Sequence, residues 1–153
     1  KIIKSTLVKA MKDNASFSLV TDINYNLNSN EIITDEFPNG LLKQYFIYNK
    51  NGLLDGESRE YYEEGDIQSV SSFKNNVANG IFISYYQNGN IKDKQNYKNG
   101  NGEGEGLFYY ENGQLMQVED RSKNGRSVKV YDKAGNLIAE NIFNKEHEIK
   151  QIY

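Results

Sequence analysis

Apolar and polar residues follow a pattern that recurs about every 24 residues, and a repeat of that length predicts stacked supersecondary units. Each unit has a glycine, four variable residues and two neighbouring aromatic residues. The copies are Gly56 with Tyr61 and Tyr62, Gly80 with Tyr85 and Tyr86, and Gly104 with Tyr109 and Tyr110. A fourth copy pairs Gly125 with Val130 and Tyr131.

A turn and an aliphatic residue follow each aromatic pair. The turn segments are 63–67, 87–91 and 111–115, then 132–137 with one inserted residue, and an earlier copy at 38–42. Asn precedes eight of the 13 glycines. Asn-Gly between apolar residues predicts a two-residue hairpin turn, because tight primed turns need positive φ at both central residues. Each unit is therefore predicted to be a β-hairpin.

Side chains three and five residues after each glycine share one side of a pleated strand, and most of them are apolar. This side is the predicted core face, with Leu107 and Tyr109 as an example. On the second strand, an aliphatic residue and an aromatic residue six positions later, such as Ile91 and Tyr97, are predicted to share a side. Polar residues such as Asp93 lie between them on that side, and the pattern gives no physical reason for this polar middle.

A lone hairpin is marginally stable in water, so the units must stack edge to edge. The predicted fold is all-β, an elongated antiparallel meander of about five stacked hairpins. Strict alternation over 17–27 and a turn at 28–30 that leads into 31–33 predict an N-terminal capping hairpin. We divide the chain into residues 1–36, with that hairpin, and residues 37–153, the repeat array. Residues 148–153 are predicted to form a last strand, whose edge offers a site for an edge-strand homo-oligomer.

Composition narrows the classes of function. The chain has 153 residues, of which 37% are hydrophobic and 25% charged, which suits a soluble folded domain. Its net charge is −3 and it has no basic run, which argues against nucleic-acid binding. It has no cysteine and one histidine, His147, so disulfides, thiolate zinc sites and paired imidazole ligands are excluded. We predict no metal, no cofactor and no enzymatic activity.

The stretch from Gly100 to Gly106 alternates glycine with polar residues and raises the question of a ligand loop. A phosphate loop needs a different glycine spacing and a following helix. The calcium-loop pattern is a nearer match, but Tyr110 occupies the twelfth position, where an EF-hand has a bidentate Glu. We interpret the stretch as a surface turn, which Gly102 and Gly106 make the most mobile turn of the array.

The second aromatic of each pair forms a candidate binding surface. Tyr62, Tyr86, Tyr110 and Tyr131 are predicted to lie in one column on the side opposite the core. One interpretation is a structural ladder in which each ring packs over the neighbouring turn. The other is a row of amphipathic contacts for a protein partner, because tyrosine is enriched at interfaces.

The recurring pattern resembles the bacterial variant of the MORN repeat over about residues 37–143. One copy carries it on Gly80, Tyr85, Tyr86, Asn88, Gly89, Ile91, Tyr97, Lys98 and Asn99, and the next on Gly104, Tyr109, Tyr110, Asn112, Gly113, Leu115, Lys123 and Asn124. The likeness departs where Glu64 replaces Asn and where Arg121 replaces the second aromatic.

The resemblance implies a binding or scaffolding module that lacks catalytic residues. Some stand-alone bacterial members are described as antitoxins, so a concrete expectation is a protein partner, namely a cognate toxin. The alternative is peripheral association with a membrane or the cell envelope, which lysines near the start, such as Lys4 and Lys9, also favour. The chain begins at Lys1 without an initiator Met, which favours export, whereas an antitoxin would be cytoplasmic.

Overall fold

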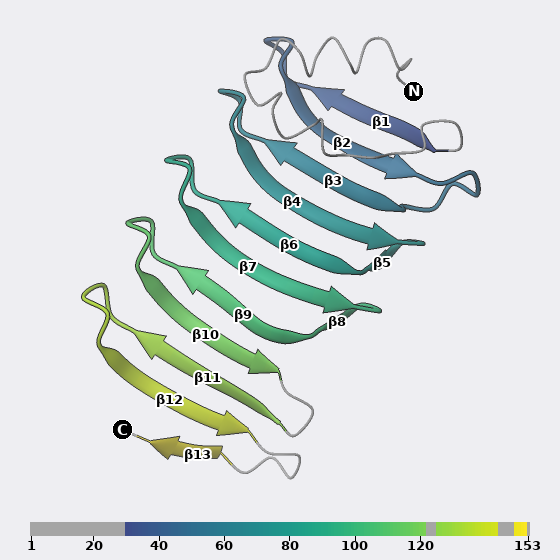
Figure 1. Cartoon of the computed structure of the whole chain (residues 1–153). Coiled ribbons are helices and arrows are strands. Elements are labelled where there is room, and N and C mark those ends of the chain that lie inside the picture. Colours follow the sequence, from purple (N-terminus) through teal and green to yellow (C-terminus); the bar gives the residue numbers. More distant parts are fainter. Residues whose placement is uncertain (1–29, 122–124, 144–148, 153) are drawn as a thin grey trace. The chain divides into compact units, whose positions relative to one another are not determined.

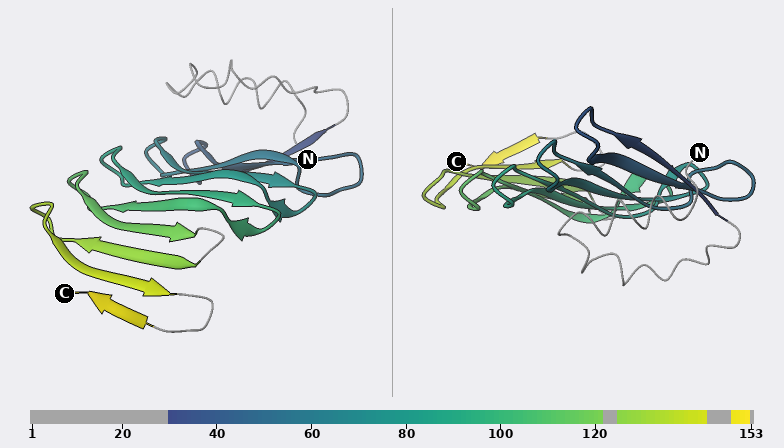
Figure 2. Two further views of the ribbon diagram at one scale, coloured as in Figure 1. Left: turned by 60° about the horizontal axis from the view of Figure 1, so that its bottom comes forward. Right: turned by 90° about the horizontal axis from the view of Figure 1, so that it is seen from above.

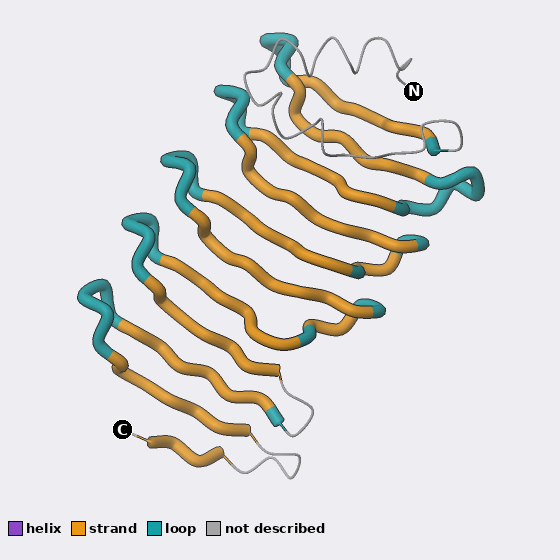
Figure 3. The backbone as a smooth tube through the Cα atoms, in the orientation of Figure 1, coloured by secondary structure: helices purple, strands orange, loops and turns teal. Residues whose placement is uncertain are grey.

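The computed structural model describes residues 30–121, 125–143 and 149–152, and the rest of the chain is drawn in grey in Figure 1. Of the capping hairpin expected over 17–33, the first strand and most of the turn lie outside these residues, while 31–33 form part of a strand; His147 also lies outside them. Throughout the described part, the regular elements are β-strands (Figure 3). The chain divides into two compact units, residues 1–77 and 78–153, which we describe separately.

Unit 1 contains four antiparallel strands in chain order. They are β1 (Glu31–Glu36), β2 (Leu42–Tyr48), β3 (Gly56–Tyr61) and β4 (Ile67–Lys74). A two-residue strand, β5 (Val77–Ala78), crosses the division between the units. The turn at Pro38–Gly40 joins β1 to β2, and the turn at 63–65 joins β3 to β4, as the glycine pattern predicts.

Unit 2 is an antiparallel meander in the order β6-β7-β9-β10-β11-β12-β13, with β8 paired to β7. The left view in Figure 2 shows the green and yellow strands of this unit side by side. The strands are β6 (Gly80–Tyr85), β7 (Ile91–Lys98), β8 (Asn101–Gly102), β9 (Gly104–Tyr109), β10 (Leu115–Arg121), β11 (Arg126–Tyr131), β12 (Leu137–Phe143) and β13 (Ile149–Ile152). The all-β meander of five hairpins is confirmed, and β13 confirms the predicted last strand.

The hairpin turns differ from the predicted two-residue primed turns. In the turn after β6, the N–H of Gly89 donates to the Tyr86 carbonyl at 2.9 Å, and the N–H of Tyr86 donates to the Asn90 carbonyl at 2.8 Å. Only the glycine has positive φ, at 84°. Asn88 instead accepts the N–H of Asn90 on its side-chain oxygen at 3.0 Å. Asn therefore stabilises these turns through its side chain, which is an Asx turn.

Primed turns do occur at the opposite end of the strands. Asn99 and Gly100, between β7 and β8, have φ values of 51° and 80°. Asn75 and Asn76, after β4, have φ values of 50° and 66°. Positive φ at both central residues is the property that Asn and Gly tolerate best. The predicted turn chemistry is thus correct for Asn99-Gly100 and wrong for the turn within each hairpin.

A β-bulge beside each hairpin turn decides which side chains share a face. In the β6–β7 pair, Tyr85 lies opposite Ile91, and the register then shifts so that Ser84 lies opposite Asp93. The shift reverses the alternation between Ile91 and Asp93. Ile91 and Tyr97 therefore lie on opposite faces, and the prediction that they share a side is wrong.

The bulge also explains the polar middle of the second strands. We call the face that carries Tyr85 and Ile91 the tyrosine face, and the face that carries Ser84 and Asp93 the polar face. The same shift occurs in the pairs β1–β2, β3–β4, β9–β10 and β11–β12. The aliphatic residue of each hairpin thus joins the tyrosine face, and the polar residues that follow it join the other face.

The core of unit 1 lies on its tyrosine face. Its four buried hydrophobic side chains are Leu42, Tyr45, Ile47 and Tyr61, exposed by 1–4%. Arg59, opposite Tyr45, is also buried on this face and binds Glu57 at 2.6 Å. Burial lowers the pKa of Arg59, but Tyr45 and Glu57 raise it more, so the net shift is upward and the guanidinium stays charged.

Candidate functional site

The tyrosine face of unit 2 carries a continuous apolar stripe beside the hairpin turns. The register places Tyr85 opposite Ile91 in the β6–β7 hairpin. The two following hairpins have an equivalent tyrosine–aliphatic pair at the same distance from the hairpin turn. The stripe therefore crosses six neighbouring strands. The six residues of the apolar stripe are Tyr85, Ile91, Tyr109, Leu115, Tyr131 and Leu137.

This face is open to solvent. Within residues 78–121 and 125–143, no side chain on the tyrosine face is buried. Ile91 and Leu137 of the apolar stripe are exposed by 37% and 50%, and Ile81 and Ile142 on the same face by 48% and 38%. Contiguous apolar surface of this kind on a folded protein marks a site of interaction.

Charged residues flank the apolar stripe in two rows. In the first row, Lys94 lies between Ile83 and Leu107 in the strand ladder, and Lys129 lies opposite Glu140. The Lys129 ammonium is 3.5 Å from that carboxylate. In the next row, Glu105 lies opposite Asp120. Along the strands away from the turns, the first row thus carries two lysines and one glutamate, with Lys94 outside the ion pair, and the next row carries two acidic residues.

The polar face of unit 2 is internally hydrogen-bonded. The Ser84 hydroxyl donates to the Asp93 carboxylate, and the Gln95 amide donates to the same carboxylate at 3.4 Å. The Tyr97 hydroxyl donates to the Gln95 side-chain oxygen at 3.3 Å. The ring of Tyr97 also packs on Phe82, with ring centres 4.7 Å apart. These side chains satisfy one another across the strands, which is a structural role.

Arg121, which replaces an aromatic residue of the repeat, extends this network. Its Nη2 donates to Glu119 at 2.6 Å and to Gln95 at 2.9 Å. Glu119 is 5% exposed and also forms an ion pair with Arg126. The two guanidinium groups provide this buried carboxylate with charged partners in place of the water that burial removes.

The extra glycines of the stretch 100–106 make room for Arg121. A Cβ on Gly102 would lie 2.4 Å from Nη1 of Arg121, and one on Gly106 would lie 3.4 Å from Nη2. Gly106 is itself buried. We interpreted these two glycines as the mark of a mobile turn, but the structure gives them a packing role. The missing side chains leave the space that the Arg121 guanidinium occupies.

The predicted tyrosine column is a backbone ladder in unit 2. The Tyr86 hydroxyl donates to the Tyr109 carbonyl at 2.8 Å, and the Tyr110 hydroxyl donates to the Tyr131 carbonyl at 2.9 Å. Each ring is half-buried beside its turn. Tyr62 begins the equivalent turn of unit 1, where its N–H donates to the Asp66 carbonyl at 2.8 Å. These contacts support the structural-ladder interpretation.

Tyr131 does not belong to this column. It lies opposite Leu137, as Tyr109 lies opposite Leu115, so it is part of the apolar stripe. The residue in the column is Asp132, because its N–H donates to the Asn136 carbonyl as that of Tyr110 donates to Gln114. The inserted residue of this hairpin therefore lies between Gly125 and Tyr131 and not in the turn at 132–137. Arg126, which lies opposite Phe143, occupies the position that glycine holds in the other copies of the repeat.

The Asp132 carboxylate closes its own turn. It accepts the side-chain amide of Asn136 and the backbone N–H groups of Asn136 and Ala134, all at 2.9 Å. The Asn136 amide, followed by these N–H groups, lowers the pKa of Asp132, because hydrogen bonds favour the ionised form.

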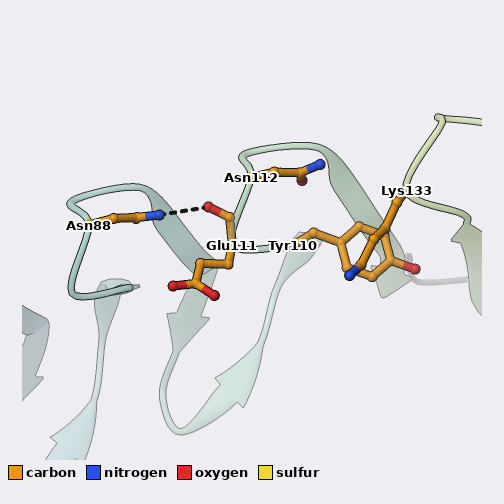
Figure 4. Close-up of a pocket in the computed structure, with 5 residues that line it drawn as sticks. All are labelled: Asn88, Tyr110, Glu111, Asn112 and Lys133. Atoms are coloured by element: carbon orange, nitrogen blue, oxygen red, sulfur yellow. Dashed lines mark hydrogen bonds between the residues drawn. The ribbon is translucent and has the colours of Figure 1, made fainter.

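A shallow pocket of about 340 Å³ lies at the turn edge of unit 2 (Figure 4). It is lined by Asn88, Tyr110, Glu111, Asn112 and Lys133. The Asn88 amide donates to the Glu111 carbonyl at 2.9 Å, and the Lys133 ammonium lies 5.8 Å from the centre of the Tyr110 ring. Asn88 and Lys133 each contact a neighbouring turn and Asn112 accepts the Gln114 N–H of its own turn, so we interpret the pocket as a gap between turns rather than a ligand site.

The described residues also lack the features of other site types. They contain no group of three or more His, Cys, Asp or Glu side chains that could hold a metal ion. None of them belongs to a helix that is long and apolar enough to cross a membrane.

Comparison with known proteins gives one family and one structure to report. Residues 54–75, 78–99 and 102–120 match the model of the MORN repeat variant. No match was found among curated proteins. A solved structure titled "Crystal structure of accessory secretory protein 1,2 and 3 in Streptococcus pneumoniae" aligns with 72% of this chain and 20% of its own, at 19% identity. Its TM-score of 0.38 is too low to support a conclusion about fold or function. The three segments, which cover less than half of the chain, are thus similar to the MORN repeat variant, a type of repeat that is generally a binding module for proteins or membranes.

Proposed function

We propose that this chain is a non-enzymatic protein-binding module and that it docks its partner on the tyrosine face of unit 2. One observation carries the proposal: this face is open, although the equivalent face of unit 1 is buried. Tyr61 is 4% exposed in unit 1, whereas Tyr109, at the equivalent position of unit 2, is half-buried. Tyrosine with aliphatic neighbours is the composition of an interface centre.

Neutralisation of a cognate bacterial toxin is the concrete form of this function that the resemblance to MORN-variant proteins suggests. An antitoxin has to cover a surface of its toxin and needs no catalytic group of its own. The ladder tyrosines Tyr62, Tyr86 and Tyr110 then act mainly by holding the turns, and Tyr131 contributes directly through the apolar stripe. A second copy paired through the β13 edge stays an alternative assembly.

Photo-cross-linking in cells of the source organism tests the docking face. A photoreactive amino acid replaces Ile91, which is 37% exposed on the apolar stripe, or Ile33, which is 38% exposed on the polar face of unit 1. We expect position 91 to give one reproducible protein adduct and position 33 to give none. Absence of an adduct at 91, or the same adduct from both positions, would contradict the proposal.

Membrane association is the alternative function, and the cross-linking experiment together with a vesicle assay distinguishes it from protein binding. Apolar side chains beside lysines also suit an anionic lipid surface. Sedimentation with vesicles of phosphatidylglycerol and phosphatidylcholine should leave the chain in the supernatant at low salt. Salt-sensitive pelleting that Ile91→Asp abolishes and Ile33→Asp leaves intact would assign the face to lipid and overturn the protein proposal.

A further inference from the structure

We infer that the tyrosine face of unit 2 takes an amphipathic α-helix of the partner protein, laid across the strands along the apolar stripe with acidic residues beside Lys94. This inference rests on the proposed function and names the chemistry of its partner. It follows from three features of the face: the direction of the apolar stripe, its length and the arrangement of charges beside it.

The direction of the apolar stripe favours a helix over a strand. Its six residues cross six strands, and neighbouring strands are about 4.8 Å apart. A helix advances about 5.4 Å per turn, so it presents about one apolar residue to each strand that it crosses. An extended chain repeats its side chains on one face only every 6.8 Å or so, which does not match this spacing. A strand added at the sheet edge would not reach Tyr109 or Leu115, which lie on inner strands.

The length of the apolar stripe sets the length of the helix. Five strand intervals span about 24 Å, which corresponds to a helix of about 16 residues. Such a helix has four to five turns and offers apolar anchors at the usual three- and four-residue spacing. Ile91 and Leu137 provide contacts towards its two ends.

The charges on the face argue against a second copy of this chain as the occupant. Two copies could lay stripe on stripe about a two-fold axis parallel to the strands. Such an axis reverses the strand order, so Lys94 would face Lys129 of the second copy and Glu105 would face its Asp120. Like charges placed opposite one another disfavour this arrangement.

The same charges determine which side of the bound helix carries acidic residues. Lys94 lies directly beside the apolar stripe, between Ile83 and Leu107, and is exposed. Glu105 and Asp120 lie farther from the stripe, where they disfavour acidic groups at the distant side of the partner. A helix with carboxylates along one border of its apolar stripe therefore fits this face best.

Three synthetic peptides test the inference on the full chain by fluorescence anisotropy. The first is an 18-residue helix with a leucine stripe bordered by Glu, the second has Lys in place of Glu, and the third has the composition of the first in an order without periodicity. We expect the first to bind at least tenfold more tightly than the other two. Equal binding of the first and third peptides, or no binding of the first at millimolar concentration, would overturn the inference.

Variants of the chain locate the binding and test the charge. Ile91→Asp should weaken binding of the first peptide at least tenfold, and Ile33→Asp, with the same residue type and almost the same exposure, should leave it unchanged. Lys94→Glu should favour the second peptide over the first. An equal effect of the two isoleucine variants, or an unchanged preference in Lys94→Glu, would contradict the inference. A protein adduct at position 91 without peptide binding would reject the helix and keep the proposed function.

Discussion

The two units use the same hairpin repeat in opposite ways. Unit 1 buries its tyrosine face, with Leu42 and Tyr61 exposed by 2% and 4%. Unit 2 places equivalent pairs, such as Tyr109 and Leu115, at the same height beside the turn and leaves them half-exposed. Its buried charge, Glu119, lies on the other face. The strand register and the position of the tyrosine–aliphatic pair beside the turn are thus properties of the repeat, whereas the burial of that pair differs between the two units.

The largest expected effect compares the two equivalent tyrosines. Tyr61→Ala should lower the free energy of unfolding by about 3–5 kcal/mol, because it leaves a cavity in a closed core. Tyr109→Ala should cost about 1–2 kcal/mol, because that side chain already meets solvent. Urea unfolding followed by circular dichroism measures both. Equal losses would show that the two faces are equally packed and would remove the basis for the comparison.

A smaller effect tests the packing that unit 2 does have, on its polar face. Gly102→Ala should destabilise the chain by about 1–2 kcal/mol, because the new methyl group displaces Arg121 from Glu119 and Gln95. Gly106→Ala is the matched control and should cost less, since its Cβ meets the guanidinium at 3.4 Å. In an Arg121→Ala background, the cost of Gly102→Ala should vanish. A cost that persists there would assign it to the backbone.

The ladder tyrosines should give a still smaller loss. Tyr110→Phe removes the hydroxyl that donates to the Tyr131 carbonyl and should cost about 1 kcal/mol in thermal unfolding. Peptide binding to the apolar stripe should be unchanged, because Tyr110 lies in the turn outside it. Tyr110→Phe binding the peptide more weakly, without loss of stability, would instead assign the tyrosine column to the interface.

The smallest expected effect is a pH dependence specific to unit 1. Burial raises the pKa of Tyr61 above its usual 10.0, and the nearby Arg59 offsets part of that increase. Both states are protonated below pH 10, and above it the unfolded chain loses its proton first, so stability falls as pH rises. Tyr61→Phe should therefore show a shallower loss of stability between pH 9 and 11. Parallel curves for the two proteins would contradict this linkage.

The repeat could be predicted from sequence because its glycines and aromatics mark strand ends directly. Asn-Gly marked three of the five hairpin turns and glycine marked all five, although a turn such as that of Asn88 uses the Asn side chain rather than positive φ at Asn. The faces could not be predicted, because one bulged residue per hairpin reverses the alternation and moved Ile91 and Tyr97 apart. That bulge has no separate signature in the sequence.

The candidate site was predicted in part for similar reasons. Leu107 and Tyr109 were expected on a core face; they do share the tyrosine face, beside Leu115, but in unit 2 that face is not buried. Tyr131 was assigned to the wrong column, because the extra residue was placed in the turn at 132–137 rather than before the tyrosine. The contact between Arg121 and Gly102 could have been predicted from the sequence. Arg121 in place of an aromatic residue and an additional glycine at 102 are two neighbouring departures from the repeat, which suggests that each compensates for the other. The exposure of the stripe could not be inferred, because it depends on packing outside the repeat.

The aspartate at position 132 has a consequence for how its hairpin turn is completed. Tyr86 and Tyr110 each send a hydroxyl to a carbonyl 23 and 21 residues ahead, so every such turn is completed by the hairpin after it. Asp132 directs its carboxylate to Asn136 and Ala134 in its own turn. The turn that begins at Asp132 is therefore complete without a hairpin after it, whereas the turns of Tyr86 and Tyr110 each depend on the next hairpin for a carbonyl partner.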